Sequence, residues 1–247
     1  MFVKVKGLVL RETEYKDHDK ILTILSDTMG LLTARAWGVK RKSSPLKSGC
    51  QLLAYAEFTL DERNGFQKVH EAVPLELFPA IRTDIELLSL ASYFAQTAEV
   101  LAQQDMPDPD LLPLILSALK ALTQNKSQAL VKAAYELRLS AVSGYEPDLT
   151  LCAQCGKEGA EYFNVSLGQL ECETCARGQV GYLRLPLSAG CLDAMRYVLA
   201  CPIGKVFSFA LGDASLKGFS QICETYFLTR LERGFSTLDF YKSLMLT

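Results

Sequence analysis

Hydrophobic and polar residues alternate along the first 75 or so positions, which is the period of half-buried β-strands. The alternation predicts strands at residues 2–10, 20–26, 31–37, 52–60 and 66–73. A Gly30-containing turn joins the second strand to the third, and an Asn64–Gly65 turn joins the last two. A longer polar loop occupies residues 38–49. Five short strands with one long connection fit a small barrel closed by hairpins.

After Pro74 and Pro79 the apolar positions recur with the period of an α-helix. Helices are predicted at residues 83–103, 108–123, 128–143, 188–200 and 215–233. A capping box of Thr83 with Glu86 begins the first of them, and Gly144 ends the third. A segment with four cysteines, at about residues 150–182, interrupts the helical series.

We therefore predict an α+β multidomain protein. Residues 1–79 form a five-stranded OB-type β-barrel, and residues 80–247 form an α-helical domain with an inserted four-cysteine zinc module. On the strand pattern alone, a small SH3-like barrel or an open sandwich fits the first domain nearly as well.

Composition limits the class of protein. The chain has 247 residues, of which 49% are hydrophobic and 22% charged, so it is neither largely disordered nor fibrous. No stretch reaches about 18 uninterrupted apolar residues, as a membrane span requires. The first residues lack the features of a signal peptide. We expect a cytoplasmic protein with no membrane partner.

Four of the eight cysteines form two pairs, Cys152-x-x-Cys155 and Cys172-x-x-Cys175, separated by 16 residues. Two such pairs can direct four thiolates at one Zn²⁺ ion, which leaves no coordination position for a catalytic water. Two disulfides are the alternative, but these are rare in cytoplasmic proteins. A redox switch that releases zinc is a further alternative. We predict one structural zinc ion.

Charge is unevenly distributed although the net charge is only −2. Residues 1–50 carry 10 Lys and Arg against 5 Asp and Glu, whereas residues 51–110 carry 3 against 11. The loop at residues 38–49 holds four cations and no acid, and Arg35 and Trp37 precede it. Cations that follow phosphates and an aromatic ring for stacking are what single-strand binding requires. The alternative is a solvated loop beside a buried Trp37, and burial is the commoner position for a lone tryptophan.

Several segments together carry a resemblance to a known family. They are residues 7–10, Tyr15, Asp19 with residues 21–22, residues 30–33, residues 37–41, residues 46–47, residues 135–139, and Gly144-Tyr145-Glu146-Pro147 leading into Cys152-Ala153-Gln154-Cys155-Gly156. In this order the chain resembles the RecO family of bacterial recombination mediators over nearly its whole length.

The resemblance implies a protein of DNA repair and recombination that is not an enzyme. Such proteins bind single-stranded DNA, anneal complementary strands, dock on the C-terminal tail of single-strand-binding protein (SSB), and with RecR help to load RecA. The implied DNA-contacting residues are Arg35, Trp37, Lys40, Arg41, Lys42 and Lys47, and the implied metal ligands are Cys152, Cys155, Cys172 and Cys175. The SSB tail is acidic and needs a cation beside an apolar groove, for which Lys132 and Arg138 are candidates.

Three other functions fit parts of the pattern. A redox-sensing zinc chaperone would release its metal on oxidation. A metal-dependent nuclease would need an acidic cluster in the basic region, and no such motif is present. A transcription-type zinc ribbon would carry cations between its cysteine pairs, where residues 156–171 hold only Lys157.

Overall fold

The computed structural model describes residues 2–63, 66–178 and 180–245. The chain folds into two compact units, one of residues 1–123 with 235–247 and one of residues 124–234. The predicted domain boundary at residues 79 and 80 stays a prediction, because compact packing is a different property from independent folding. Among the described residues, no helix has both the length and the apolar character needed to cross a membrane.

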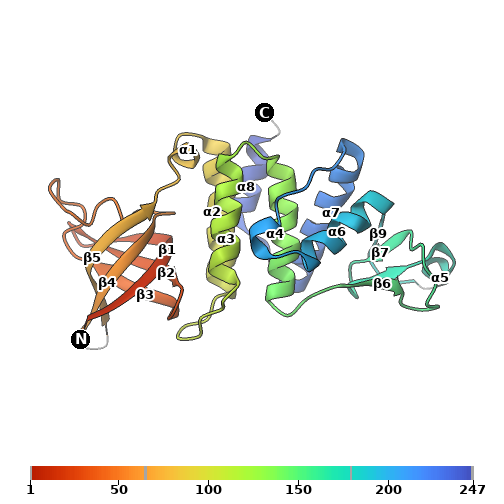
Figure 1. Ribbon diagram of the computed structural model, residues 1–247, viewed down its shortest axis with the longest axis horizontal. Helices are drawn as coiled ribbons and strands as arrows, with labels where there is room; N and C mark the ends of the chain where they lie inside the picture. The colour runs from red at the N-terminus through yellow and green to blue at the C-terminus, as the bar shows by residue number, and fades with distance from the viewer. Residues whose placement is uncertain (1, 64–65, 179, 246–247) are drawn as a thin grey trace. The chain divides into compact units, whose positions relative to one another are not determined.

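The first unit contains a closed barrel of strands in the order β1-β2-β3-β5-β4 (Figure 1). The strands are β1 (Phe2–Tyr15), β2 (Asp19–Ser26), β3 (Gly30–Ala36), β4 (Tyr55–Arg63) and β5 (Phe66–Glu76). All neighbours pair antiparallel except β3 and β5, which are parallel. The predicted OB-type barrel is therefore confirmed, and the open sandwich is wrong. The predicted Asn64–Gly65 turn lies outside the described residues.

Strand β1 is longer than the alternation of the sequence suggested. A bulge between Val9 and Arg11 shifts the pairing register, after which β1 continues along β2 until Tyr15 pairs with Asp19. Glu12 and Glu14, which follow the strand predicted at residues 2–10, lie within this extension. The extension brings Tyr15 and Asp19 to the end of the β1–β2 hairpin, where they contact Arg35 of β3.

The loop at residues 38–49 is anchored at both ends. Val39 and Leu46 are buried in the apolar core of the barrel, and so is Cys50 just after the loop. Backbone turns close within the loop, where Arg41 N–H donates to the Gly38 carbonyl at 3.0 Å. Between these buried positions, the polar side chains of the loop are exposed to solvent, except for the half-buried Ser44.

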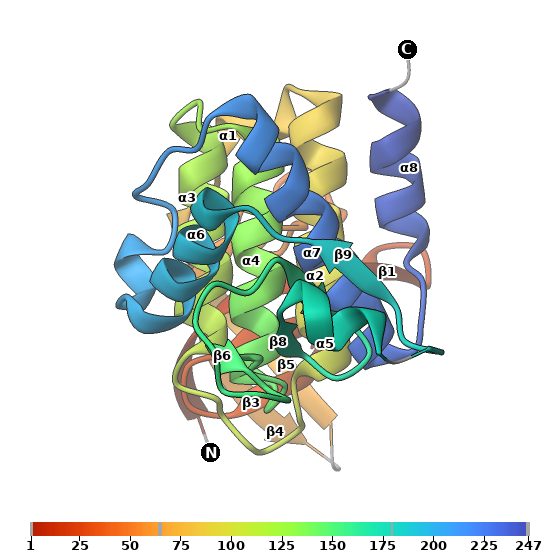
Figure 2. The same cartoon turned by 90° about the vertical axis from the view of Figure 1, so that its right-hand side faces the viewer.

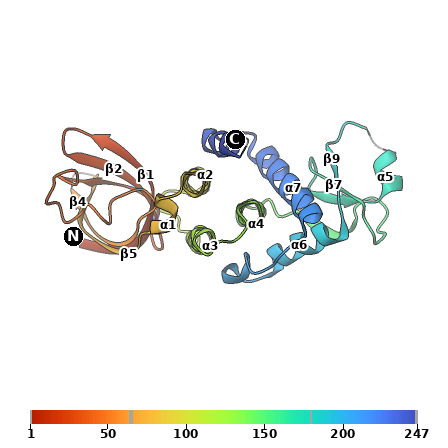
Figure 3. The same cartoon turned by 90° about the horizontal axis from the view of Figure 1, so that it is seen from above.

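Four helices of the described residues complete the first unit: α1 (Pro79–Arg82), α2 (Ile85–Leu101), α3 (Leu111–Thr123) and α8 (Ser236–Leu244) (Figure 3). The predicted cap of α2 is wrong, because Asp84 rather than Thr83 accepts hydrogen bonds from the N–H groups of Glu86 and Leu87. The sequence did not predict α8, which follows Phe235. The Phe235 ring lies edge-on to Tyr93 of α2 at 5.6 Å between centroids.

The second unit contains helices and a small sheet (Figure 2). Its elements are α4 (Gln128–Val142), β6 (Asp148–Cys152), β7 (Tyr162–Asn164), β8 (Gln169–Glu171), α5 (Glu173–Arg177), β9 (Arg184–Pro186), α6 (Ala189–Ala200), the 3₁₀ turn η1 (Ile203–Lys205) and α7 (Asp213–Leu231). Helices α4 and α7 pack together, and the sheet order is β6-β8-β7-β9. The predicted C-terminal glycine of α4 is confirmed, since Gly144 has φ +85°.

Candidate nucleic-acid interface and metal centre

Four side chains form a row on the outer surface of the barrel, in which aromatic rings alternate with cations. We call Tyr15, Arg35, Trp37 and Lys68 the stacking row. The Arg35 guanidinium carbon lies 4.5 Å from the Tyr15 ring centroid and 4.7 Å from that of Trp37. The Lys68 ammonium lies 4.4 Å from the Trp37 ring centroid. Cations at these distances are attracted by the negative faces of the rings.

The tertiary structure exposes the tryptophan. Alternate residues of a strand point to opposite faces, and Ala34 and Ala36 point into the barrel core. Trp37 is 52% exposed and Tyr15 is 37% exposed. The interpretation of Trp37 as a core residue is therefore wrong, and its ring is available for stacking.

Asp19 fixes the position of the Arg35 side chain. One carboxylate oxygen of Asp19 accepts from Arg35 Nη2 at 2.6 Å and from Nε at 3.2 Å, while the other accepts from the Gly38 N–H at 2.8 Å. The Gly38 N–H and the Arg35 guanidinium hold the pKa of Asp19 below its ordinary value. One carboxylate thus joins the stacking row to the start of the loop at residues 38–49, which we call the basic loop.

The predicted DNA-contacting cations fall into two groups. Arg35 pairs with Asp19, and Lys40 pairs with Glu14 at 3.0 Å, where the Lys40 ammonium lowers the pKa of the Glu14 carboxyl. Arg41, Lys42 and Lys47 are exposed, and within the described part of the chain no carboxylate lies within ion-pair distance of them. The second group is the one that has its charge available for phosphates.

The four predicted metal ligands converge at one point of the second unit. The Sγ atoms of Cys152, Cys155, Cys172 and Cys175 all lie within 4.8 Å of one another. The Cys155 and Cys172 sulfurs are 3.7 Å apart, which is close to the edge of about 3.8 Å expected for a tetrahedral zinc–thiolate centre with bonds of about 2.3 Å. All four are free thiols, so the alternative of two disulfides is wrong. The donor set fits a metal ion.

Backbone N–H groups favour anionic sulfur at one of the four cysteines, Cys152. Burial raises the pKa of Cys152, but the N–H groups of Cys172, Cys155 and Gln154 outweigh it and lower the pKa to about 6. Hydrogen bonding with the Cys172 and Cys155 sulfurs raises the pKa of Cys175 to about 12. A divalent cation among the four sulfurs would favour the thiolate form of each.

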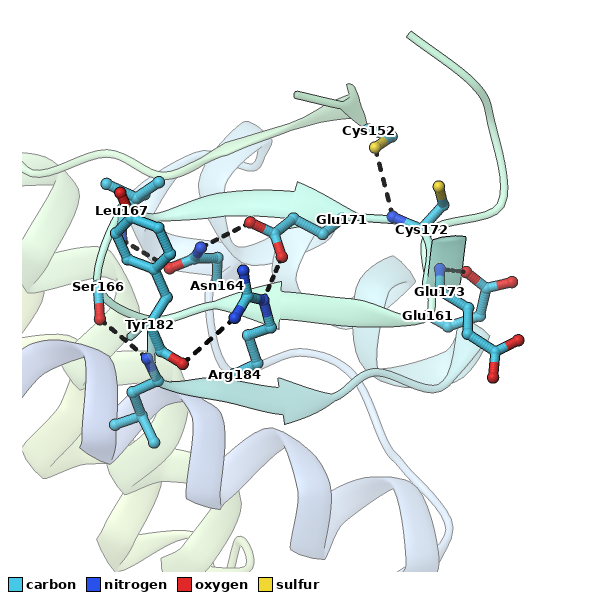
Figure 4. Close-up of polar contacts among 11 residues, drawn as sticks. Cys152, Glu161, Asn164, Ser166, Leu167, Glu171, Cys172, Glu173, Tyr182 and Arg184 are labelled. Carbon is cyan, nitrogen blue, oxygen red and sulfur yellow. Dashed lines mark hydrogen bonds and ion pairs between the residues drawn. The ribbon is translucent and has the colours of Figure 1, made fainter. Parts of the chain in front are cut away.

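A buried polar cluster supports the strands beside the metal centre (Figure 4). Asn164 of β7 donates to Glu171 of β8 at 2.6 Å, and Arg184 of β9 donates to the other oxygen of the same carboxylate. Glu161 accepts from the Glu173 N–H at 2.9 Å, at the start of the helix that carries Cys175. The sequence did not reveal this cluster, because Asn164 and Glu171 alternate with the apolar Phe163 and Leu170 along short strands, as exposed polar residues would.

Comparison with known proteins identifies the family. The family model for the N terminus of recombination protein O matches residues 1–78, and the model for its C terminus matches residues 82–239. The chain belongs to the RecO family. The resemblance noted in the sequence is thereby confirmed, and the N-terminal RecO match ends two residues after β5.

RecO proteins of several bacteria are similar to this chain over most of its length. It is 30% identical to the DNA repair protein RecO of Acetivibrio thermocellus over 98% of the chain and 97% of that protein. It is 30% identical to the same protein of Desulfitobacterium hafniense over 92% and 85% of the two chains. For Alkaliphilus metalliredigens the identity is 25%, over 99% and 100%.

The two residues considered for the SSB tail of RecO proteins already bind other groups in the second unit. Lys132 is buried, and its ammonium lies 2.9 Å from Glu136 and 2.7 Å from Glu224. Arg138 donates to the carbonyl groups of Val198 and Leu199. The candidacy of Lys132 is therefore wrong, because an acidic peptide cannot reach its ammonium.

Proposed function

We propose that this RecO-family protein is a DNA repair and recombination mediator that binds single-stranded DNA through the outer surface of its barrel. The observation that carries the proposal is the position of Arg41, Lys42 and Lys47, three exposed cations without carboxylate partners among the described residues. They lie on a loop that begins beside two exposed aromatic rings. Cations and stacking surfaces together form the binding groove of single-strand-binding OB-folds.

The role is positional and involves no covalent chemistry on DNA. A protein that neutralises phosphates lowers the repulsion between two strands, so the same surface favours annealing of complementary strands. We propose that the protein acts with RecR and the SSB tail to promote RecA loading, in the bacterial cytoplasm and at the nucleoid. This part of the proposal follows from membership of the RecO family.

We further propose that the four cysteines hold one structural Zn²⁺ ion, which ties the turn after β6 to the start of α5. The spacer at residues 156–171 carries Lys157 as its only cation, against three glutamates. This composition supports a bracing role rather than a DNA contact.

Replacing Arg41, Lys42 and Lys47 together with alanine should weaken single-strand binding and its dependence on salt. Each lost phosphate contact reduces the slope of log K against log salt by about 0.7, so the three should reduce it by about 2. At low salt we expect a loss of affinity of about tenfold or more. Fluorescence anisotropy with a labelled oligonucleotide over a salt series measures both quantities.

The matched control is the replacement of Lys120, Lys126 and Lys217 with alanine. These lysines are exposed and lie outside the barrel, and their loss changes the net charge equally. If both triple variants had the same affinity and slope as the unmodified protein, the basic loop would have no part in DNA binding.

A further inference from the structure

The stacking row has a feature that a simple basic patch lacks, because its central cation is already neutralised. Arg35 uses Nε and Nη2 to bind the Asp19 carboxylate, and its guanidinium lies between the rings of Tyr15 and Trp37. A phosphate would have to displace Asp19 to use the Nε–Nη2 edge of the guanidinium, and elsewhere it would meet a charge that Asp19 already balances. The stacking row is thus better suited to stacking against bases than to binding phosphates.

We propose that the stacking row is a platform for unpaired nucleobases, in which Arg35 is a stacking plane and Asp19 is its positioning residue. A base takes a place against the exposed Trp37 ring, and Lys68 turns from that ring to the phosphate of the same nucleotide. The inference rests on the proposed function and adds Tyr15, Lys68 and Asp19 to the site.

The geometry explains why the platform would select single strands. A base within a duplex already has neighbours on both faces, whereas an unpaired base offers a free π-face to an aromatic ring. Stacking of this kind tolerates every base, so we expect little sequence preference. Arg41, Lys42 and Lys47 would then supply the salt-dependent part of binding, and the stacking row would supply the part that depends on bases.

Trp37 provides a direct signal, because it is the only tryptophan of the chain. We expect an oligothymidylate of about 15 nucleotides, a length that covers one OB-fold, to quench the tryptophan fluorescence of the full protein. An abasic oligonucleotide of equal length carries the same charge, so it should bind at low salt without quenching. Equal quenching and equal affinity for both oligonucleotides would overturn the inference.

Two neighbouring carboxylates provide a matched pair of variants. Asp17→Asn and Asp19→Asn each remove one negative charge from the end of the same β1–β2 hairpin, but Asp17 is exposed while Asp19 binds Arg35 and Gly38. If charge alone mattered, both variants would bind the oligonucleotide equally tightly. We expect Asp19→Asn to bind about tenfold more weakly than Asp17→Asn and to lose most of the quenching. Matching thermal melts of the two variants would show that the fold is retained.

The substitution Arg35→Lys distinguishes a stacking role of the Arg35 side chain from a phosphate-binding role. Lysine keeps the charge but loses the planar group. A phosphate contact would be largely rescued by lysine, whereas a stacking plane would not, and Arg35→Lys should then bind as weakly as Arg35→Ala. The salt slope of both variants should stay near that of the unmodified protein, while Lys42→Ala should lower it by about 0.7.

The outcomes distinguish this inference from the proposed function. Failure of any oligonucleotide to bind at low salt would overturn both. Binding that is equal for thymidylate and abasic strands, with full rescue by Arg35→Lys, would overturn the stacking platform and leave single-strand binding in place.

Discussion

Removing the Zn²⁺ ion that we propose for the four-cysteine centre should unfold the small sheet of the second unit. The strands β7, β8 and β9 have three residues each, and the apolar residues buried among them are few, chiefly Phe163 and Leu170. Strands this short make few pairings, so the sheet depends on further support such as the contact of Phe163 with the Tyr226 ring of α7 and the proposed ion. Metal binding in small zinc modules contributes about 10 kcal/mol or more to the free energy of folding. Losing that contribution should leave the folded sheet less stable than the unfolded segment.

The rate at which trypsin cleaves after Arg184 measures this unfolding. Arg184 is bound to the buried Glu171, so cleavage after it should be slow in the metal-loaded protein and fast after chelation or in Cys155→Ser. Mass spectrometry identifies the cleavage site, and added Zn²⁺ should restore protection to the chelated protein. Cys201→Ser is the control, because Cys201 lies outside the cluster. Continued protection of Arg184 without metal would contradict a structural role for the ion.

The same preparation tests the redox-chaperone alternative. Mild peroxide should leave zinc bound and Arg184 protected if the centre is structural. Release of the ion together with new binding of a hydrophobic dye would favour the chaperone instead.

Replacing Lys132 with methionine should lower the free energy of unfolding by about 3–5 kcal/mol. The ammonium lies between Glu136 and Glu224, and Glu136 is fully buried. Methionine fills a similar volume but removes the cation from both carboxylates, and the loss of one partner from a buried ion pair is among the costliest changes in a protein interior. Urea unfolding measures the loss.

The control for this prediction is Lys120→Met, which removes an exposed lysine from α3 and should change stability by less than about 0.5 kcal/mol. Lys132→Met with Glu136→Gln should recover part of the loss, because it removes one of the two charges left behind. A loss at Lys132 no greater than at Lys120 would show that the buried ion pairs do not stabilise the fold.

The pH dependence of this cluster has a definite sign. Burial lowers the pKa of Lys132, but the carboxylates of Glu136 and Glu224 outweigh that effect and raise it above its ordinary value of 10.5. A raised pKa in the folded state means that the contribution is fully present below the unfolded pKa and is lost as pH rises through the folded one. On the alkaline side, the stability difference between the unmodified protein and Lys132→Met should therefore persist until strong alkali removes the charge of Lys132.

The sequence by itself determined the features that depend on local pattern. Alternating apolar residues placed the barrel strands, the spacing of the cysteine pairs indicated the metal ligands, and Gly144 marked the end of α4. Each of these signals lies within a few residues of the element that it describes. Local sequence was less reliable at boundaries, where Asp84 replaced Thr83 as the cap and β1 extended to Tyr15.

Only the tertiary structure decided which cations are available and which rings are exposed. Arg35 and Lys40 look like Arg41 and Lys42 in the sequence, yet the extended β1–β2 hairpin brings Asp19 and Glu14 to the first two alone. Lys132 shares α4 with Glu136, but its second carboxylate, Glu224, reaches it only through the packing of α4 on α7. Ion pairing depends on distances between segments that are far apart along the chain, and hydrophobic periodicity carries no information about such distances.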